Sequence, residues 1–252
     1  MSLLVLGFIL LLQPLCGIHA NKEGDVLYWF MKSIEDPNDA IANWDNFLVN
    51  PSTWWRVVCN QDNSVIKINL GRQGLSGLLS ADLGKLKNLQ HMLLNDNNMS
   101  GPIHNEFGKL GSLLDLDLHN NILNGSVPDS LGNLSKLLYL RLQGNKLTGN
   151  IPTSLSKLQN LLVLLLTLPL QEGFFLFLTL PQLIYCSDFC LNRDLSNNKI
   201  SGQIPAELAG LPKLRYLNLS NNQLQGKLPA AFAKTQIILD VTNNPHLIIG
   251  KN

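Results

Sequence analysis

Leucines recur along most of the chain in a short L-x-L pattern, in which two apolar positions flank a third that is often polar. The clearest case is Leu140 and Leu142 with Arg141 between them. Alternation over so few residues is typical of a short strand with one buried face. Gly and Pro recur between these segments and would interrupt any long helix. The pattern therefore predicts a series of short strands whose leucines point inward, and it excludes a long amphipathic helix.

The strands belong to a regular repeat. L-x-G-like triplets begin at a constant spacing in two sets, which are Leu75, Met99, Leu123 and Leu147, and then Ile200 and Leu224. The surrounding pattern, LxxLxLxxNxLxGxIPxxLGxL, is the signature of a leucine-rich repeat with a 24-residue period. It predicts an α/β fold, a right-handed solenoid of about six repeats with a parallel concave β-sheet.

Two further positions in the repeat have structural roles. The asparagines are expected to satisfy backbone groups that would otherwise be buried and unpaired where the chain leaves each strand. They are Asn97, Asn121, Asn145, Asn198 and Asn222. Each G-x-I-P element is followed by a short helical turn, such as 131–134.

Composition supports a repeat and excludes several classes of protein. The 252 residues include 55 Leu and 29 Asn, and the formal net charge is +1. A near-neutral chain gives no electrostatic argument for binding nucleic acid or a membrane surface. Residues 1–20 contain an apolar core followed by small residues, which is typical of a signal peptide, and the core is too short to span a membrane.

The sequence offers no candidate for catalysis or for a cofactor. Ser154-x-x-Lys157 falls on the repeat frame at a helical turn, and we do not interpret it as a nucleophile with its base. The five histidines lack the spacing of metal ligands, and His91 and His119 are expected to be solvated. Cys186-x-x-x-Cys190 has no second cysteine pair with which to bind zinc. The chain is therefore predicted not to be an enzyme.

The L-x-G-x-I-P form resembles the plant-specific class of leucine-rich repeats. Residues 21–64 resemble the plant N-terminal cap, through 21–25, 36–38, 44–45 and 48–51. With 65–161 they most resemble the ectodomains of somatic embryogenesis receptor kinases and their short secreted relatives without a kinase. The resemblance implies repeats over 65–247 and a monomeric, secreted, extracellular protein without a membrane span. It also implies a protein or peptide partner, such as a receptor kinase ectodomain.

Three features depart from that family. Ser52 stands where the family's cap has a cysteine, so Cys59 lacks the partner that the resemblance implies. The tail, 248–252, stops before the closing cysteine of the short secreted relatives, and Leu239 falls two residues early in the last repeat. The third departure is an insertion.

The insertion lies between Gly149 and Gly202 and covers 165–193, because deleting that range restores a normal repeat. In this alignment it interrupts the L-x-L strand itself. We interpret it as translated intron sequence, with a genuine extra loop and a transmembrane segment as the alternatives. Glu172 and two prolines break its apolar runs below the length that spans a membrane.

The expected binding surface is the concave face together with the cap, because non-leucine strand positions face outward in a solenoid. The candidates are Trp54, Trp55, Arg56, Lys67, Asn69, Arg72, His91, Asn95, Asp96, Asp115, Asp117, His119, Tyr139, Arg141, Gln143, Tyr216 and Asn218. The resemblance implies aromatic residues, mainly Tyr, at the positions of His91, Asn95 and His119. Of the family's binding residues in this group, the chain keeps only Arg141.

Four sequons, at Asn98, Asn124, Asn133 and Asn218, are candidate glycosylation sites. Asn218 is the least favourable of them, because it points off a strand into the concave face. The leading hypothesis is a secreted recognition module in plant cell-surface signalling or defence. The alternatives are an inhibitor of cell-wall hydrolases such as polygalacturonases, and a degenerate or wrongly spliced gene product without function.

Overall fold

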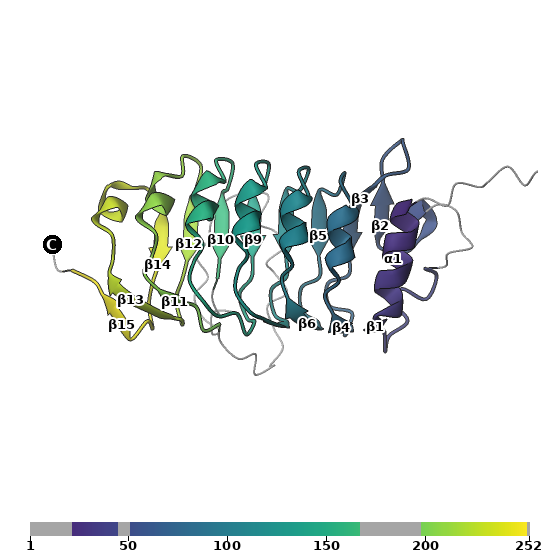
Figure 1. Ribbon diagram of the computed structural model, residues 1–252, viewed down its shortest axis with the longest axis horizontal. Coiled ribbons are helices and arrows are strands. Elements are labelled where there is room, and N and C mark those ends of the chain that lie inside the picture. The colour runs from purple at the N-terminus through teal and green to yellow at the C-terminus, as the bar shows by residue number, and fades with distance from the viewer. Residues whose placement is uncertain (1–21, 45–50, 167–197, 251–252) are drawn as a thin grey trace, which may run out of the picture.

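The computed structural model describes residues 22–44, 51–166 and 198–250. They form an elongated row of coils, in which each coil lies against the next along one axis (Figure 1). Strands line one side of the row and short helices line the other. The period of the sequence therefore becomes one coil of a solenoid, which confirms the predicted fold.

One long sheet forms the strand side. It contains eight strands in the order β14-β12-β10-β9-β7-β5-β3-β2, and all neighbours are parallel except β2 and β3. Their bounds are β2 (Val57–Cys59), β3 (Val65–Asn69), β5 (His91–Leu93), β7 (Asp115–Asp117), β9 (Tyr139–Arg141), β10 (Val163–Leu165), β12 (Tyr216–Asn218) and β14 (Ile238–Asp240). The L-x-L segments are thus strands, as predicted.

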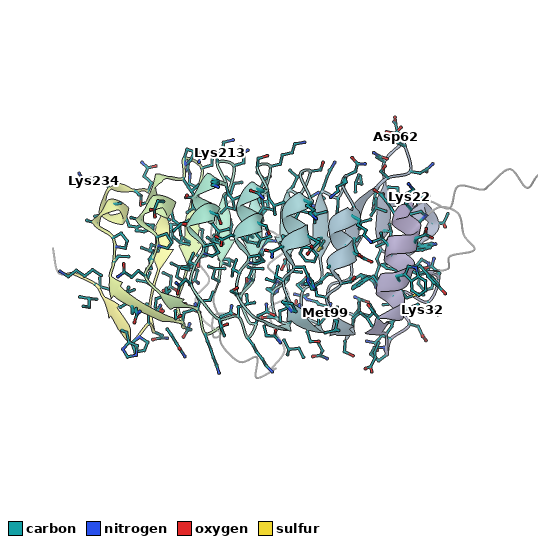
Figure 2. All side chains as sticks on the ribbon, in the orientation of Figure 1. Lys22, Lys32, Asp62, Met99, Lys213 and Lys234 are labelled. Atoms are coloured by element: carbon teal, nitrogen blue, oxygen red, sulfur yellow. The ribbon has the colours of Figure 1, made fainter. Side chains whose placement is uncertain are left out.

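The opposite side consists of 3-10 helices, one per coil. They are η2 (Ala81–Lys85), η3 (Asn105–Lys109), η4 (Asp129–Asn133), η5 (Thr153–Lys157), η7 (Ala206–Gly210) and η8 (Ala230–Lys234), and η1 (Pro51–Thr53) lies in the cap. Lys213 and Lys234 project from this edge into solvent (Figure 2). The helices are short because the period leaves each coil only a few residues on this side.

Smaller sheets run along a third edge of the coils. One contains β1 (Ile34–Glu35), β4 (Ser76–Leu78), β6 (Asn98–Pro102) and β8 (Ile122–Asn124), and the other contains β11 (Ser201–Gly202), β13 (Gln223–Lys227) and β15 (His246–Ile248). The L-x-G triplets lie here. Their glycines have positive φ, such as 128° at Gly77 and 74° at Gly125, a conformation that glycine adopts without a steric penalty.

The leucines of successive coils stack into one continuous core. Leu116, Leu140 and Leu164 are fully buried on three neighbouring strands. The predicted asparagine ladder runs beside them and is confirmed. Asn121 Nδ2 donates to the carbonyls of Leu94, Leu118 and His119 at 3.0–3.1 Å, and its Oδ1 accepts the Met99 N–H at 2.9 Å. Each asparagine therefore joins two coils through buried backbone groups.

The cap closes the first coil with a helix and two stacked indoles. Helix α1 (Lys22–Lys32) buries Leu27 and Phe30 against the core. Trp44 and Trp54 stack with ring centroids 5.6 Å apart, and both are 2% exposed. Glu23 accepts the Val65 N–H at 2.5 Å, which ties the helix to the first parallel strand.

The chain completes strand β10 before the insertion begins. Val163, Leu164 and Leu165 pair in register with both β9 and β12. Leu166 is buried, and its carbonyl accepts from Asn198 at 3.2 Å. The prediction that the insertion interrupts the strand at 165 is therefore wrong. Leu165 and Leu166 occupy the two repeat positions after Leu164, which the sequence alignment gives to 194 and 195. The leucine core therefore continues through this coil.

The last coil is shorter by two residues, as expected from the sequence. Leu239 pairs with Leu217, and Asn244 occupies the ladder position that follows Asn222. Asn244 is thus a member of the ladder that the repeat pattern does not predict. Ile248 pairs with Lys227, so the last lateral strand extends one residue into the predicted tail. The predicted signal peptide and nearly all of the insertion lie outside the described residues.

Candidate protein-binding surface

The open face of the long sheet carries two rows of side chains. The middle residue of each parallel strand points into the core, fully buried except for the partly buried Leu239 in β14, so the residues on either side of it face away from the core. Strand register places Val58, Lys67, His91, Asp115, Tyr139, Val163, Tyr216 and Ile238 in the first row. The second row contains Asn69, Leu93, Asp117, Arg141, Leu165, Asn218 and Asp240.

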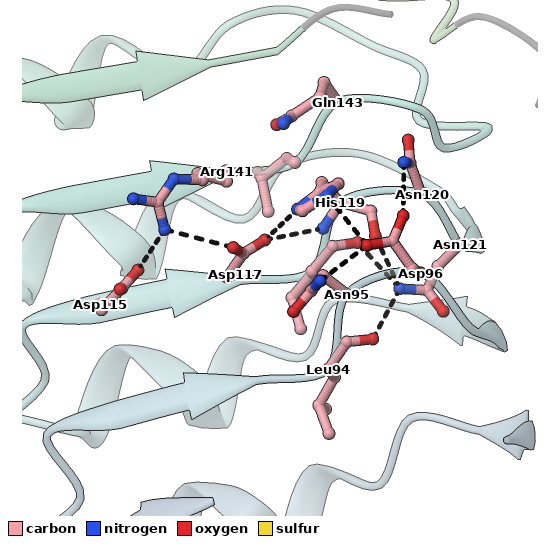
Figure 3. A network of polar contacts seen from close by, with 12 residues as sticks. Leu94, Asn95, Asp96, Asp115, Asp117, His119, Asn120, Asn121, Arg141 and Gln143 are labelled. Carbon is pink, nitrogen blue, oxygen red and sulfur yellow. Dashed lines mark hydrogen bonds and ion pairs between the residues drawn. The ribbon is translucent and has the colours of Figure 1, made fainter. Parts of the chain in front are cut away.

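The part of this face between β3 and β9 is an alternating network of charges (Figure 3). Arg141 Nη1 contacts Asp115 at 3.0 Å and Asp117 at 3.2 Å. Asp117 also contacts His119 Nδ1 at 2.5 Å, and His119 Nε2 lies 3.4 Å from Asp96. The network continues to Arg72, whose Nε lies 3.2 Å from Asp96 in a more exposed position. The sequence identified these residues but did not predict their pairing.

The imidazole of His119 is held as a cation. Burial alone would lower its pKa, but hydrogen bonds to Asp117 and Asp96, and their charges, raise it to about 9. Both ring nitrogens face carboxylates, which requires both to be donors. The prediction that His119 is solvated is therefore wrong, because only 9% of the residue is exposed.

Two carboxylates of the network, Asp96 and Asp115, have pKa values shifted in opposite directions. Burial alone would raise the pKa of Asp96, but His119, Asn120 and Asn95 hold it well below its usual range. Burial raises the pKa of Asp115 to about 6, against the lowering effect of Arg141 and with a further rise from Asp117. The polar atoms of Asp117 and His119 are thus paired with other residues of the network. These two residues hold Arg141 in place and offer little surface of their own to a binding partner.

The first row of the face is apolar between β9 and β14, whereas the second row there also carries Arg141, Asn218 and Asp240. Tyr139, Val163, Tyr216 and Ile238 are neighbours in the first row, and Leu165 lies beside them in the second. Ile238 is 42% exposed and the others are half-buried. We call these five residues the apolar patch. Of these five residues, only the two tyrosines are among the candidates predicted from the sequence. Counting one repeat on from Tyr139 and Arg141 finds Val163 and Leu165, but the predicted break at 165 removed Leu165 from the strand.

Tyr139 forms the boundary between the two parts. The Arg141 guanidinium lies 5.0 Å from the centre of its ring, within the range of a cation–π contact. The charged network therefore holds the tyrosine at the edge of the apolar patch.

The cap presents one tryptophan and buries the other. Trp55 is 58% exposed, and its backbone is held by Asn43 Oδ1 and the Trp44 ring N–H, each at 2.9 Å. Arg56 is exposed with φ of 66°. The prediction that Trp54 contacts a partner is wrong, because its ring completes the core of the cap.

The remaining predicted residues vary in their exposure. Asn69 and Arg72 are exposed, whereas Lys67, His91 and Asn95 are half-buried. Gln143 and Asn218 are 5% and 3% exposed, so neither offers much surface to a partner. Asn218 Oδ1 accepts the Ser220 N–H at 3.0 Å. A glycan would be attached to Nδ2, which lies 3.5 Å from the Tyr216 hydroxyl in this buried position, so the structure argues against Asn218 as a glycosylation site.

The other three sequons lie at the surface. Asn124 and Asn133 are exposed, on β8 and at the end of η4, and Asn98 is half-buried on β6. Among the residues that the structure describes, no three His, Cys, Asp or Glu side chains gather as a metal site would require. Within the same ranges, no helix is both long and apolar enough to cross a membrane. Burial, with the charge of Glu23, raises the pKa of the free Cys59 thiol to about 11.

Family models match the repeats on both sides of the insertion. The model described as "Leucine Rich Repeat" matches 88–110, 112–134 and 136–158, and a second, "Leucine rich repeat", matches 194–224. The chain is 49% identical over 77 residues to "Leucine-rich repeat protein 1" of Arabidopsis thaliana, a match that covers 31% of this chain and 35% of that protein. It thus spans about a third of that relative's length.

Solved plant ectodomains share the fold. The Arabidopsis receptor kinase HAESA, in complex with the peptide hormone IDA and the co-receptor SERK1, matches at a TM-score of 0.69 and 26% identity, over 90% of this chain and 34% of that one. The BIR3–SERK2 complex from Arabidopsis thaliana matches at 0.58 and 26%, over 80% and 94%. The chain therefore contains leucine-rich repeats, has homologues among plant leucine-rich repeat proteins and shares the fold of plant receptor kinase ectodomains.

Proposed function

We propose that the chain is a secreted, co-receptor-like recognition module in plant cell-surface signalling or defence, which binds a protein or peptide partner. The observation that carries the proposal is the apolar patch on the open face of the sheet. Five apolar side chains on four adjacent strands face solvent, where a sheet that only meets water carries polar residues.

The patch has the composition of an interface centre. Tyr139 and Tyr216 offer large contact areas and lose little conformational entropy on binding, and tyrosine is enriched among residues that dominate binding energy. Val163 and Leu165 fill the strand between them. The charged network borders the patch on one side, as the polar rim of an interface would.

The network contributes rigidity rather than electrostatic steering. Arg72, His119 and Arg141 alternate with Asp96, Asp117 and Asp115, so its charges compensate one another. The resemblance and the solved neighbours support an extracellular setting, because HAESA is a receptor kinase with a peptide hormone bound. By this reasoning, the partner meets the sheet mainly at β9–β14, and Trp55 extends the surface only at the cap.

The test is binding to a panel of purified plant receptor kinase ectodomains by surface plasmon resonance. Tyr216→Ala removes one ring of the patch and should weaken binding by about 2 kcal/mol, or roughly 30-fold in Kd. Gln223→Ala, on the exposed lateral strand β13, is the matched control and should bind as the unmodified chain does.

Two results would contradict the proposal. One is a partner whose affinity survives Tyr216→Ala together with Val163→Ser. The other is a partner lost only on Trp55→Ala, which would move the site to the cap.

A further inference from the structure

A polar hollow of about 710 Å³ lies on the helix side, away from the open face of the sheet. It is bordered by η4, η5 and η7, and every side chain that lines it carries a hydroxyl, carboxylate, amide or ammonium group. Asp129 and Glu207 supply carboxylates, Ser154 and Ser156 supply hydroxyls, and Lys157 supplies an ammonium. Such a surface is suited to a neutral ligand rich in hydroxyl and amide groups.

A change in the repeat explains why the hollow forms here. The fourth residue of η2, η3 and η4 is glycine, and a Cβ on Gly84, Gly108 or Gly132 would overlap the backbone of the next coil. These helices therefore touch. The same position in η5 is Ser156, whose Cβ needs that space. Helix η7 therefore packs less closely on η5 than η5 does on η4, and the hollow extends over η4 and η5 to Glu207 of η7.

Asn133 places a sequon at the border of this hollow. It is the last residue of η4, its side chain is exposed, and it lines the hollow. The Ser135 N–H donates to the Asn133 carbonyl at 2.9 Å, so the sequon turns tightly while Leu134 is buried in the core. In the other described helices η2, η3, η5, η7 and η8, the equivalent residue is lysine or glycine.

We infer that the hollow holds the first sugars of an N-linked glycan attached to Asn133. An N-acetylhexosamine presents hydroxyls and an acetamide, which pair with carboxylate acceptors, serine hydroxyls and a lysine donor. Ser154 Oγ already donates to Asp129 at 3.1 Å, which fixes one wall of the hollow. The inference rests on the secretion that belongs to the proposed function, because the glycan is attached in the secretory pathway.

The experiment compares two glycans on the same molecule. The full chain is secreted from cells that leave high-mannose glycans, and the native protein is treated with an endoglycosidase that cuts between the first two sugars. Glycopeptide mass spectrometry follows Asn133 against Asn124, the matched exposed sequon on β8. We expect the Asn133 glycan to be released at least tenfold more slowly, and the difference to vanish after denaturation.

A double variant, Ser154→Ala with Glu207→Gln, should bring the Asn133 rate close to that of Asn124. Equal release rates at Asn133 and Asn124 in the protein without substitutions would overturn the inference. So would a protein in which Asn124 carries a glycan and Asn133 carries none. If the chain stays inside the cell and carries no glycan, both this inference and the secretion in the proposed function fail. Binding to the receptor panel is measured separately, so its failure leaves the glycan result unaffected.

Discussion

Replacing Asn121 by alanine tests whether the asparagine ladder holds the coils together. The side chain makes four hydrogen bonds of 2.9–3.1 Å to backbone groups on two coils, and it is 2% exposed. A hydrogen bond contributes about 1 kcal/mol net, and a buried group left unpaired costs about 1–3 kcal/mol. The three carbonyls keep other donors, which are the Asp96 N–H for His119 and the neighbouring ladder asparagines for Leu94 and Leu118. We therefore expect a loss of about 3–5 kcal/mol in the free energy of unfolding.

The assay is urea and thermal unfolding followed by circular dichroism, on protein without glycans. For a chain of this size, the loss corresponds to a fall in Tm of about 10 °C. Asn124→Ala is the matched control, because this asparagine is exposed three residues further along. Its effect should stay within about 0.5 kcal/mol.

Asn121→Asp provides a second, independent prediction. The carboxylate would keep the acceptor for Met99 but would bring negative charge against three carbonyl oxygens. It should therefore be at least as damaging as alanine. The reasoning is refuted if Asn121→Ala costs less than about 1 kcal/mol, the net value of one hydrogen bond, or if Asn121→Asp is the milder of the two.

Three further predictions concern pH, the cap and the sequons. The raised pKa of His119 adds stability that is fully present below pH 6.5 and is lost as the pH rises through about 9. The Tm of the protein without substitutions should therefore fall over that pH range, and the Tm of His119→Gln should not. The oxidised Ser52→Cys variant should form a disulfide with Cys59 and raise Tm by a few degrees, because closing so short a loop contributes about 2.5 kcal/mol. An undiminished thiol count together with an unchanged Tm would exclude that pairing. In secreted protein, glycopeptide mapping should find Asn124 occupied and Asn218 bare, because Asn218 is only 3% exposed. A glycan on Asn218 would show that this burial does not prevent modification.

The repeat frame could be predicted from the sequence because each coil contacts only its neighbours. A constant period fixes which residue follows which in every coil, and the same local pattern places Leu140, Leu164 and the asparagines without further information. The repeat frame also predicts the shorter last coil, in which Leu239 falls two residues early and pairs with Leu217. It failed at Leu165, where a run of leucines fits two alignments. Strand pairing on both sides decides between them.

What only the tertiary structure decided depends on distances between coils. His119 is a buried cation because Asp96 of one coil and Asp117 of its own reach its two ring nitrogens. No periodicity encodes that pairing. Trp54 and Trp55 are adjacent in sequence, yet one completes the core of the cap and the other faces solvent. The sequence by itself determined the coil and which of its positions are buried leucines, ladder asparagines or turn glycines, because these follow from local periodicity. The charge states, the apolar patch and the hollow beside Asn133 arise only where neighbouring coils meet, because burial and electrostatic contact are properties of that packing.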